Sequence, residues 1–118
     1  MTLIEKQKVF SFKLAELILE ARNLGWEITM GECWRPHETA EIYARDGKGI
    51  QNSAHCIRLA CDLNLFKNGL LVTDSFGHEP LGDWWKAQST EELTFIWGGD
   101  FRPNPDGNHY AISHGGVK

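Results

Sequence analysis

Apolar positions in the first part of the chain recur every three or four residues. From Thr2 to Leu24 this spacing predicts an amphipathic helix, with Thr2 as its N-cap and Glu5 three residues later completing a capping box. Gly25 stands where a helix C-terminal stop is expected. A second helix is predicted from Pro36 to about Arg45, because proline suits the first turn of a helix. A short third helix is predicted from Leu81 to Gln88.

Elsewhere apolar and polar residues alternate, which is typical of strands with one buried face. Lys67-Asn68-Gly69 is a tight hairpin signal between two such stretches. The predicted strands are 26–30, Leu59–Phe66, 70–72 and His109–Ser113. Residues 95–97 lead into Gly98-Gly99, where the backbone either turns sharply or is closely approached. Helices beside an antiparallel sheet predict the α+β class, here a small antiparallel sheet with flanking helices.

Length and charge narrow the range of functions. At 118 residues the chain is expected to form a single domain over residues 1–118. A formal net charge of −4 argues against a nucleic-acid-binding protein. Charges interrupt every apolar stretch, so no membrane insertion is expected. Met1 to Phe10 shows no secretory signal pattern.

The three cysteines, Cys33, Cys56 and Cys61, cannot all pair within one chain, so we expect thiols in a reducing cytoplasm. Cys33 is expected to behave as a small buried apolar residue. The side chain of Cys56 could face either the metal site or the core. A thiolate zinc site is a rival interpretation, but strand neighbours point to opposite faces. If Asp62 faces a metal, Cys61 faces the core.

His55, Asp62 and His109 are a candidate metal-binding set of two histidines and one carboxylate. Three such ligands leave a fourth zinc position open for water, as in hydrolytic sites. Asp106 lies close to His109, and Gly107 allows the bend that would direct its carboxylate to that water as general base. The alternatives are a polar strand residue for Asp62 and a plain turn at 106–107. The other histidines, His37, His78 and His114, are expected to be solvated.

The sequence motifs around these residues are more specific than the spacing of the residues alone. Ser-x-His-x6-Asp at 53–62, Trp-Gly-Gly-Asp-Phe at 97–101 and Asp-x-x-His-Tyr at 106–110 occur in that order. This pattern resembles the zinc peptidases of bacterial cell-wall metabolism, which are metallo D-Ala-D-Ala carboxypeptidases and dipeptidases and phage L-alanyl-D-glutamate endopeptidases. The resemblance covers roughly Gly31 to the C-terminus and is strongest to small phage and prophage members. It implies a metallo DD-peptidase (hedgehog-like) fold.

The resemblance also implies a role for each matching residue. One Zn2+ per chain would be held by His55, Asp62 and His109, with Asp106 as catalytic acid/base. Arg35, at the end of Gly31-Glu32-Cys33-Trp34-Arg35, would hold a substrate carboxylate or the developing oxyanion. The implied substrate-binding residues are Ser53, Trp97 and Tyr110.

This sequence departs from the family pattern at three places. Pro36 to Ala40 replaces a common Ser-x-x-x-Gln stretch, Arg58 replaces a common glycine, and Asp106 replaces a common glutamate. None of these changes removes a predicted metal ligand. They bear on substrate choice, which would depend on the pocket around Arg35 and on the 36–52 segment.

The function implied is a zinc-dependent, endolysin-like peptidoglycan peptidase that cuts the stem peptide at the L-alanyl-D-glutamate bond. The alternatives are a D-Ala-D-Ala carboxypeptidase or dipeptidase, and a non-catalytic zinc-stabilised binding module. The resemblance implies a bacteriophage or prophage enzyme of host lysis that degrades the cell wall. Such a protein is expected to be a monomer without a separate wall-binding domain. It would wait in the host cytoplasm until holin-type release.

Overall fold

A computed structural model describes residues 1–49 and 52–118, so two residues of the 36–52 segment lie outside the description. The helices are α1 (Leu3–Asn23), α2 (His37–Arg45) and α3 (Glu79–Lys86). The strands are β1 (Glu27–Met30), β2 (Ala60–Lys67), β3 (Leu70–Leu71), β4 (Phe95–Trp97) and β5 (His109–Ile112). Short 3₁₀ helices occur at η1 (Ala54–Ile57), η2 (Phe76–His78) and η3 (Gly98–Asp100).

Helix α1 begins as its sequence predicts. The Thr2 hydroxyl accepts a hydrogen bond from the Glu5 backbone N–H, and the Glu5 side chain accepts one from the Thr2 backbone N–H. This capping box satisfies two backbone donors that the first helical turn leaves without intrahelical partners. Phe10, Leu17 and Ala21 form the buried face of the helix.

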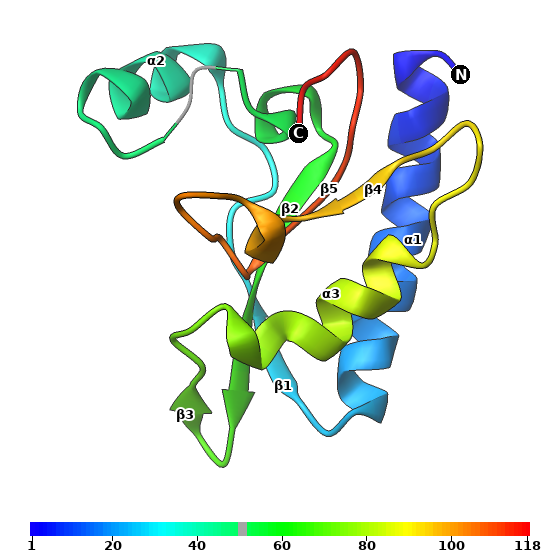
Figure 1. Cartoon of the computed structure of the whole chain (residues 1–118), viewed down its shortest axis with the longest axis vertical. Coiled ribbons are helices and arrows are strands. Elements are labelled where there is room, and N and C mark those ends of the chain that lie inside the picture. The colour runs from blue at the N-terminus through cyan, green and yellow to red at the C-terminus, as the bar shows by residue number, and fades with distance from the viewer. Residues whose placement is uncertain (50–51) are drawn as a thin grey trace.

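The strands form an antiparallel sheet in the order β1-β2-β5-β4, with β3 returning along β2 as a hairpin. Helices α1 and α3 lie together against one face of the sheet, and α2 stands apart at the opposite side of the molecule (Figure 1). The α+β prediction is therefore confirmed, although α3 begins two residues earlier than its pattern indicated. No helix in the described part of the chain has the length and apolar character needed to cross a membrane.

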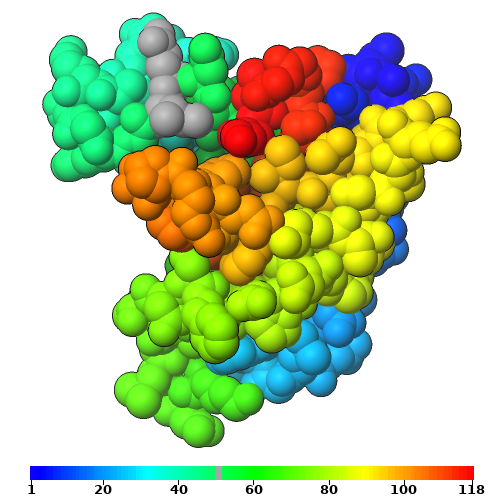
Figure 2. Space-filling view, viewed as in Figure 1, coloured from blue at the N-terminus to red at the C-terminus, as the bar shows by residue number. Residues whose placement is uncertain are grey.

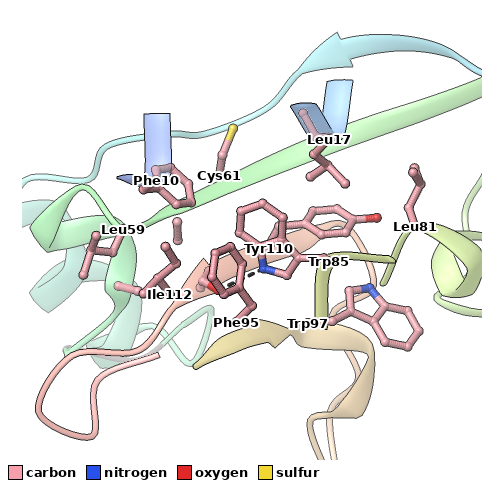
Figure 3. Close-up of a cluster of buried hydrophobic side chains, with 14 of the residues drawn as sticks. Phe10, Leu17, Leu59, Cys61, Leu81, Trp85, Phe95, Trp97, Tyr110 and Ile112 are labelled. Carbon is pink, nitrogen blue, oxygen red and sulfur yellow. Dashed lines mark hydrogen bonds between the residues drawn. The ribbon is translucent and has the colours of Figure 1, made fainter. Parts of the chain in front are cut away.

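The core lies between the two helices and the sheet. Trp85 of α3 is fully buried and donates a hydrogen bond from Nε1 to the Ala111 carbonyl oxygen at 2.9 Å, which fixes the helix to the central strand β5 (Figure 3). Along β2, Cys61, Leu63 and Leu65 are buried in this core. Asp62, Asn64 and Phe66 are only partly buried. This alternation leaves the face of the sheet away from α1 and α3 available for a polar site.

Candidate metal centre

The sheet register brings two of the predicted ligands together. Asp62 on β2 lies directly opposite His109 on β5, in antiparallel pairing. Directly opposite residues in an antiparallel pair project from the same face with Cβ atoms about 5 Å apart. Both side chains therefore emerge on the face away from the core, although they are 47 positions apart in the sequence.

The third predicted ligand, His55, comes from the short helix that precedes β2. The Ser53 hydroxyl caps η1 by accepting a hydrogen bond from the His55 backbone N–H at 3.2 Å. The helix ends at Arg58, whose φ of 58° is left-handed, and the chain then turns into β2. A left-handed backbone favours glycine, which explains why glycine is common at this position of the family. The turn places His55 over the Asp62–His109 pair.

The three ligand atoms form a small triangle. His55 Nε2 lies 3.2 Å from Asp62 Oδ1 and 3.1 Å from His109 Nδ1, and the third side measures 3.6 Å. Tetrahedral zinc with bonds of 2.0–2.1 Å has ligand–ligand separations of about 3.3 Å. Asp62 Oδ1 is buried and has no hydrogen-bond partner among the described residues. The donor set therefore fits a zinc ion on geometry and on ligand chemistry.

Neighbouring groups prepare these side chains for a cation. His55 Nδ1 lies 3.3 Å from the Cys33 carbonyl oxygen, which can only accept a hydrogen bond. Nδ1 therefore carries the ring proton, and the Nε2 lone pair faces the other ligands. Burial raises the pKa of Asp62, but the interactions with the adjacent His109 and His55 side chains outweigh burial and lower the pKa to about 2. The carboxylate is thus ionised at neutral pH.

Gly31 positions Asp62 from the neighbouring chain segment. The Gly31 backbone N–H donates to the Asp62 carbonyl oxygen at 2.8 Å. A Cβ atom at position 31 would lie 2.9 Å from the Asp62 Cβ and 3.0 Å from its carbonyl oxygen. Only glycine allows the two segments to approach this closely. Gly31, the first residue of the predicted arginine motif, therefore also supports the predicted ligand Asp62.

Arg35 is held at the edge of the triangle by a residue that sequence reasoning missed. Glu32 Oε1 accepts a hydrogen bond from Arg35 Nε at 2.8 Å and forms an ion pair with Arg35 Nη2 at 2.6 Å. The same oxygen lies 3.9 Å from His55 Nδ1. Glu32 therefore links the predicted substrate-binding arginine to a predicted ligand. The position of Glu32 inside the Gly31–Arg35 motif was the sequence signal that could have identified it as a site residue.

Asp106 lies in the loop that leads into β5. Its backbone N–H donates to the Gly98 carbonyl oxygen at 2.8 Å, and its own carbonyl accepts from the His109 N–H at 3.1 Å. Asp106 as a residue is exposed, yet its carboxyl group is partly removed from water. This desolvation raises the pKa of Asp106, His109 opposes the increase and Asp62 adds to it.

A cleft of about 450 Å³ gathers the predicted site residues. Arg35, Ser53, His55, Asp106 and His109 all line it, and Lys48, Phe101 and Lys118 complete part of its wall. Figure 2 shows the orange loop that carries Asp106 below the teal region of α2 and next to the red C-terminal residues. The structure thus brings the two predicted ligand histidines, the predicted acid/base and the arginine to one cleft, and Asp62 contacts both histidines.

Trp97 and Tyr110 do not line that cleft, which corrects the expectation that they bind substrate there. They pair directly across β4 and β5 and are 5% and 0% exposed. Tyr110 follows the predicted ligand His109 on the strand, so the alternation of side chains directs Tyr110 into the core. The same alternation directs Cys61, the neighbour of Asp62, into the core. Trp97 donates from Nε1 to the Gly107 carbonyl oxygen at 2.7 Å and supports the Asp106 loop from behind.

Two other side chains differ from expectation. His78 was expected to be solvated, but it is 3% exposed and its Nδ1 lies 3.0 Å from the Tyr110 hydroxyl. Cys33 was expected to be buried, but it is exposed because it lies in the coil after edge strand β1. Cys61 is buried, as alternation predicted, and His37 is exposed. The group of potential ligand atoms found among the described residues is His55, Asp62 and His109, without a cysteine.

Solved structures include one with the same fold. The crystal structure of the Serratia marcescens L-Ala D-Glu endopeptidase ChiX superposes with a TM-score of 0.69. The alignment covers 92% of this chain and 84% of that chain, at 18% sequence identity. No curated protein matches the chain.

A family model described as D-alanyl-D-alanine carboxypeptidase matches residues 46–112. The matched segment contains the three-ligand triangle and Asp106, whereas Arg35 lies before it. Because the match spans more than half of the sequence, the chain belongs to the D-alanyl-D-alanine carboxypeptidase family and is a metallopeptidase.

Proposed function

We propose that the protein is a zinc-dependent peptidoglycan peptidase that hydrolyses the L-alanyl-D-glutamate bond of the stem peptide. The observation that carries the proposal is one cleft lined by the two ligand histidines, Arg35 and the Asp106 residue, with the third ligand, Asp62, in contact with both histidines. A zinc site that only stabilises a binding module has no use for Asp106 or Arg35. Their presence in the same cleft favours an enzyme over that alternative.

Each residue has a distinct task in this proposal. His55 Nε2, Asp62 Oδ1 and His109 Nδ1 would hold the zinc ion, which would polarise a carbonyl and lower the pKa of water to about 7. Asp106 accepts the proton of the attacking water and then donates it to the leaving amine. The raised pKa of Asp106 suits this exchange, because it makes the carboxylate a stronger base toward the proton of the attacking water. The leaving amine is a stronger base still, so it can take the proton from the Asp106 carboxyl group.

Arg35 supplies fixed donors for an anionic group of the substrate. Glu32 engages its Nε and Nη2 atoms, which orients the guanidinium without using Nη1. A planar guanidinium held in this way suits a carboxylate or a developing oxyanion. Ser53 is buried, lines the cleft and keeps the η1 turn in shape.

The choice of bond is supported by space on both sides of Asp106. A second hollow of about 350 Å³ also includes Pro105 and Asp106 in its lining, and continues past Ser75 and His78 toward the β3 hairpin. An endopeptidase must accommodate peptide on both sides of the scissile bond. A carboxypeptidase needs room for only one residue on the leaving side.

Charge in the cleft supports the same choice. Arg35, Lys48 and Lys118 line it, with Asp106 as the carboxylate among its lining residues. The fragment released from the L-alanyl-D-glutamate bond carries the α-carboxylate of glutamate and the carboxylates of the residues that follow. Terminal D-alanine carries a single carboxylate, so the more anionic fragment matches this surface better.

Muropeptide analysis tests the proposal directly. Zinc-loaded protein is incubated with purified sacculi, and the products are identified by mass spectrometry. We expect new fragments with a free D-glutamate amino group. Release of D-alanine instead would replace the endopeptidase assignment with the carboxypeptidase or dipeptidase alternative.

Variants separate the metal site from the acid/base. His109→Ala is expected to lose zinc, whereas Asp106→Asn is expected to retain zinc and lose turnover. A protein that binds zinc and sacculi but releases no fragment of either kind would support the binding-module alternative.

We also propose that the protein acts as a monomeric lytic enzyme of the endolysin type, since one chain supplies every residue of the site. Light scattering of the zinc-loaded protein tests the monomer. Loss of turbidity from outer-membrane-permeabilised bacteria tests lysis. A dimer in light scattering would contradict the monomer. Cells that stay intact although the protein digests purified sacculi completely would contradict the lytic role.

A further inference from the structure

Cys33 and Cys61 meet directly beside the metal centre. Their sulfur atoms lie 2.9 Å apart, although the residues are 28 positions apart in the sequence. Cys61 is fully buried, whereas Cys33 is exposed to solvent. In Figure 3 the Cys61 sulfur points away from the aromatic cluster, toward the coil that follows β1.

The backbone explains why these two residues face each other. Along the regular part of the pairing, Met30 lies opposite Leu63. Beyond it, the Gly31 N–H donates to the Asp62 carbonyl at 2.8 Å, while the Asp62 N–H donates to the Glu32 carbonyl at 2.9 Å. Two residues thus stand opposite one, which is the arrangement of a β-bulge.

The bulge shifts the register by one residue. Without it, Cys33 would lie opposite Ala60; with it, Cys33 lies opposite Cys61. Directly opposite residues of antiparallel segments have Cα atoms about 4.5–5.5 Å apart, within the range that disulfides require. The cysteine pair therefore follows from backbone pairing as well as from the position of the sulfur atoms.

We propose that Cys33 and Cys61 are a disulfide-forming site that closes on oxidation and fastens the two segments of the metal centre. Cys61 immediately precedes ligand Asp62, and the Cys33 carbonyl faces His55 Nδ1 at 3.3 Å. A bond between their side chains would hold the Asp62 segment and the His55 acceptor at a fixed separation. This inference is independent of which peptide bond the enzyme cuts.

With glutathione disulfide as oxidant the chemistry balances. The exposed Cys33 thiolate attacks glutathione disulfide, forming a mixed disulfide and releasing one glutathione. Cys61 sulfur then attacks the Cys33 sulfur, forming the protein disulfide and releasing the second glutathione. The two cysteines lose two electrons and two protons, and glutathione disulfide gains them.

Peptide mapping tests the site. The zinc-loaded protein is equilibrated with glutathione disulfide, alkylated without reduction and digested. We expect one linked peptide pair, Cys33 with Cys61, and alkylated Cys56. Cys33→Ser, at an exposed position, should fold and yield no linked pair, and Cys56→Ser should form the pair as the wild type does. Persistent alkylation of Cys33 and Cys61, or a linked pair that includes Cys56, would overturn the proposal.

Stability measures the consequence. Closing a loop of this length should raise the Tm of the oxidised wild type above that of the reduced wild type by about 10 °C. Cys33→Ser should show no such difference between oxidising and reducing conditions. Transfer of zinc to a chromophoric chelator should be slower from the oxidised wild type. A lower Tm or faster zinc transfer after oxidation would show that the bond distorts the centre and would refute the fastening role.

Discussion

The close approach of Gly31 to Asp62 gives a quantitative prediction for Gly31→Ala. The added Cβ would lie 2.9 Å from the Asp62 Cβ, whereas ordinary van der Waals contacts begin at 3.4 Å, so the two segments must separate by about 0.5 Å. Metal sites tolerate deviations of about 0.2 Å in ligand distance. The substitution therefore displaces a ligand by more than the site accepts.

Two effects should follow from this displacement. Forcing an additional carbon into a packed contact costs about 1–3 kcal/mol of unfolding free energy. Disturbing a group that supports a metal ligand lowers metal affinity by about 10–100-fold. Urea unfolding of the chelator-treated protein measures the first effect, and competition with a chromophoric zinc chelator measures the second.

Gly49→Ala is the matched control. Its added Cβ would meet the Tyr43 Cβ at 3.5 Å and Arg35 Nη1 at 3.7 Å, which are ordinary contacts. We expect a stability change within about 0.5 kcal/mol and unchanged zinc affinity for this variant. Wild-type stability and zinc affinity in Gly31→Ala would refute the reasoning, because the contact with Asp62 would then carry no constraint.

Three further predictions concern separate residues. Asp106→Asn should retain stoichiometric zinc by atomic absorption while sacculus hydrolysis falls about 10²–10⁴-fold, and undiminished hydrolysis would exclude it as acid/base. Burial lowers the pKa of His78 below 6.5 in the folded protein, while Asp74 opposes the decrease. The unfolded chain then binds more protons, so stability is complete above that value and falls at lower pH. In His78→Gln this acid-dependent loss should be smaller in urea unfolding at about pH 5.5 and 7.5, and an unchanged slope would contradict the role. Arg58 has a left-handed backbone, so Arg58→Gly should be more stable than Arg58→Ala by about 1 kcal/mol; both variants lose the stacking on Trp34, and equal stabilities would disprove the strain.

Local sequence patterns determined the elements and much of the site. The capping residues and apolar spacing of the first helix are short-range features, and α1 follows them. Alternation along β2 assigned Asp62 and Cys61 to opposite faces before any pairing was known. The ligand set, Asp106 and Arg35 came from family motifs whose order survives in this sequence. The structure groups the three ligands, and it places both histidines, Asp106 and Arg35 in one cleft.

The same alternation could have corrected one expectation. Tyr110 follows a ligand on a strand, so its side chain had to point toward the core rather than toward substrate. Trp97 followed it there, because the two residues are cross-strand neighbours. Their burial is thus a consequence of strand pairing, which a motif does not display.

Tertiary structure alone decided the remaining features, because they depend on contacts between distant segments. Glu32 gains its role by meeting both Arg35 and the His55 turn. His78 becomes buried only because η2 packs onto Tyr110 of β5. The bulge at Gly31 and Glu32 arises from pairing with a strand thirty positions away, and it places Cys33 opposite Cys61. A one-residue shift in register is invisible in either segment by itself, since each determines its own alternation but not its partner.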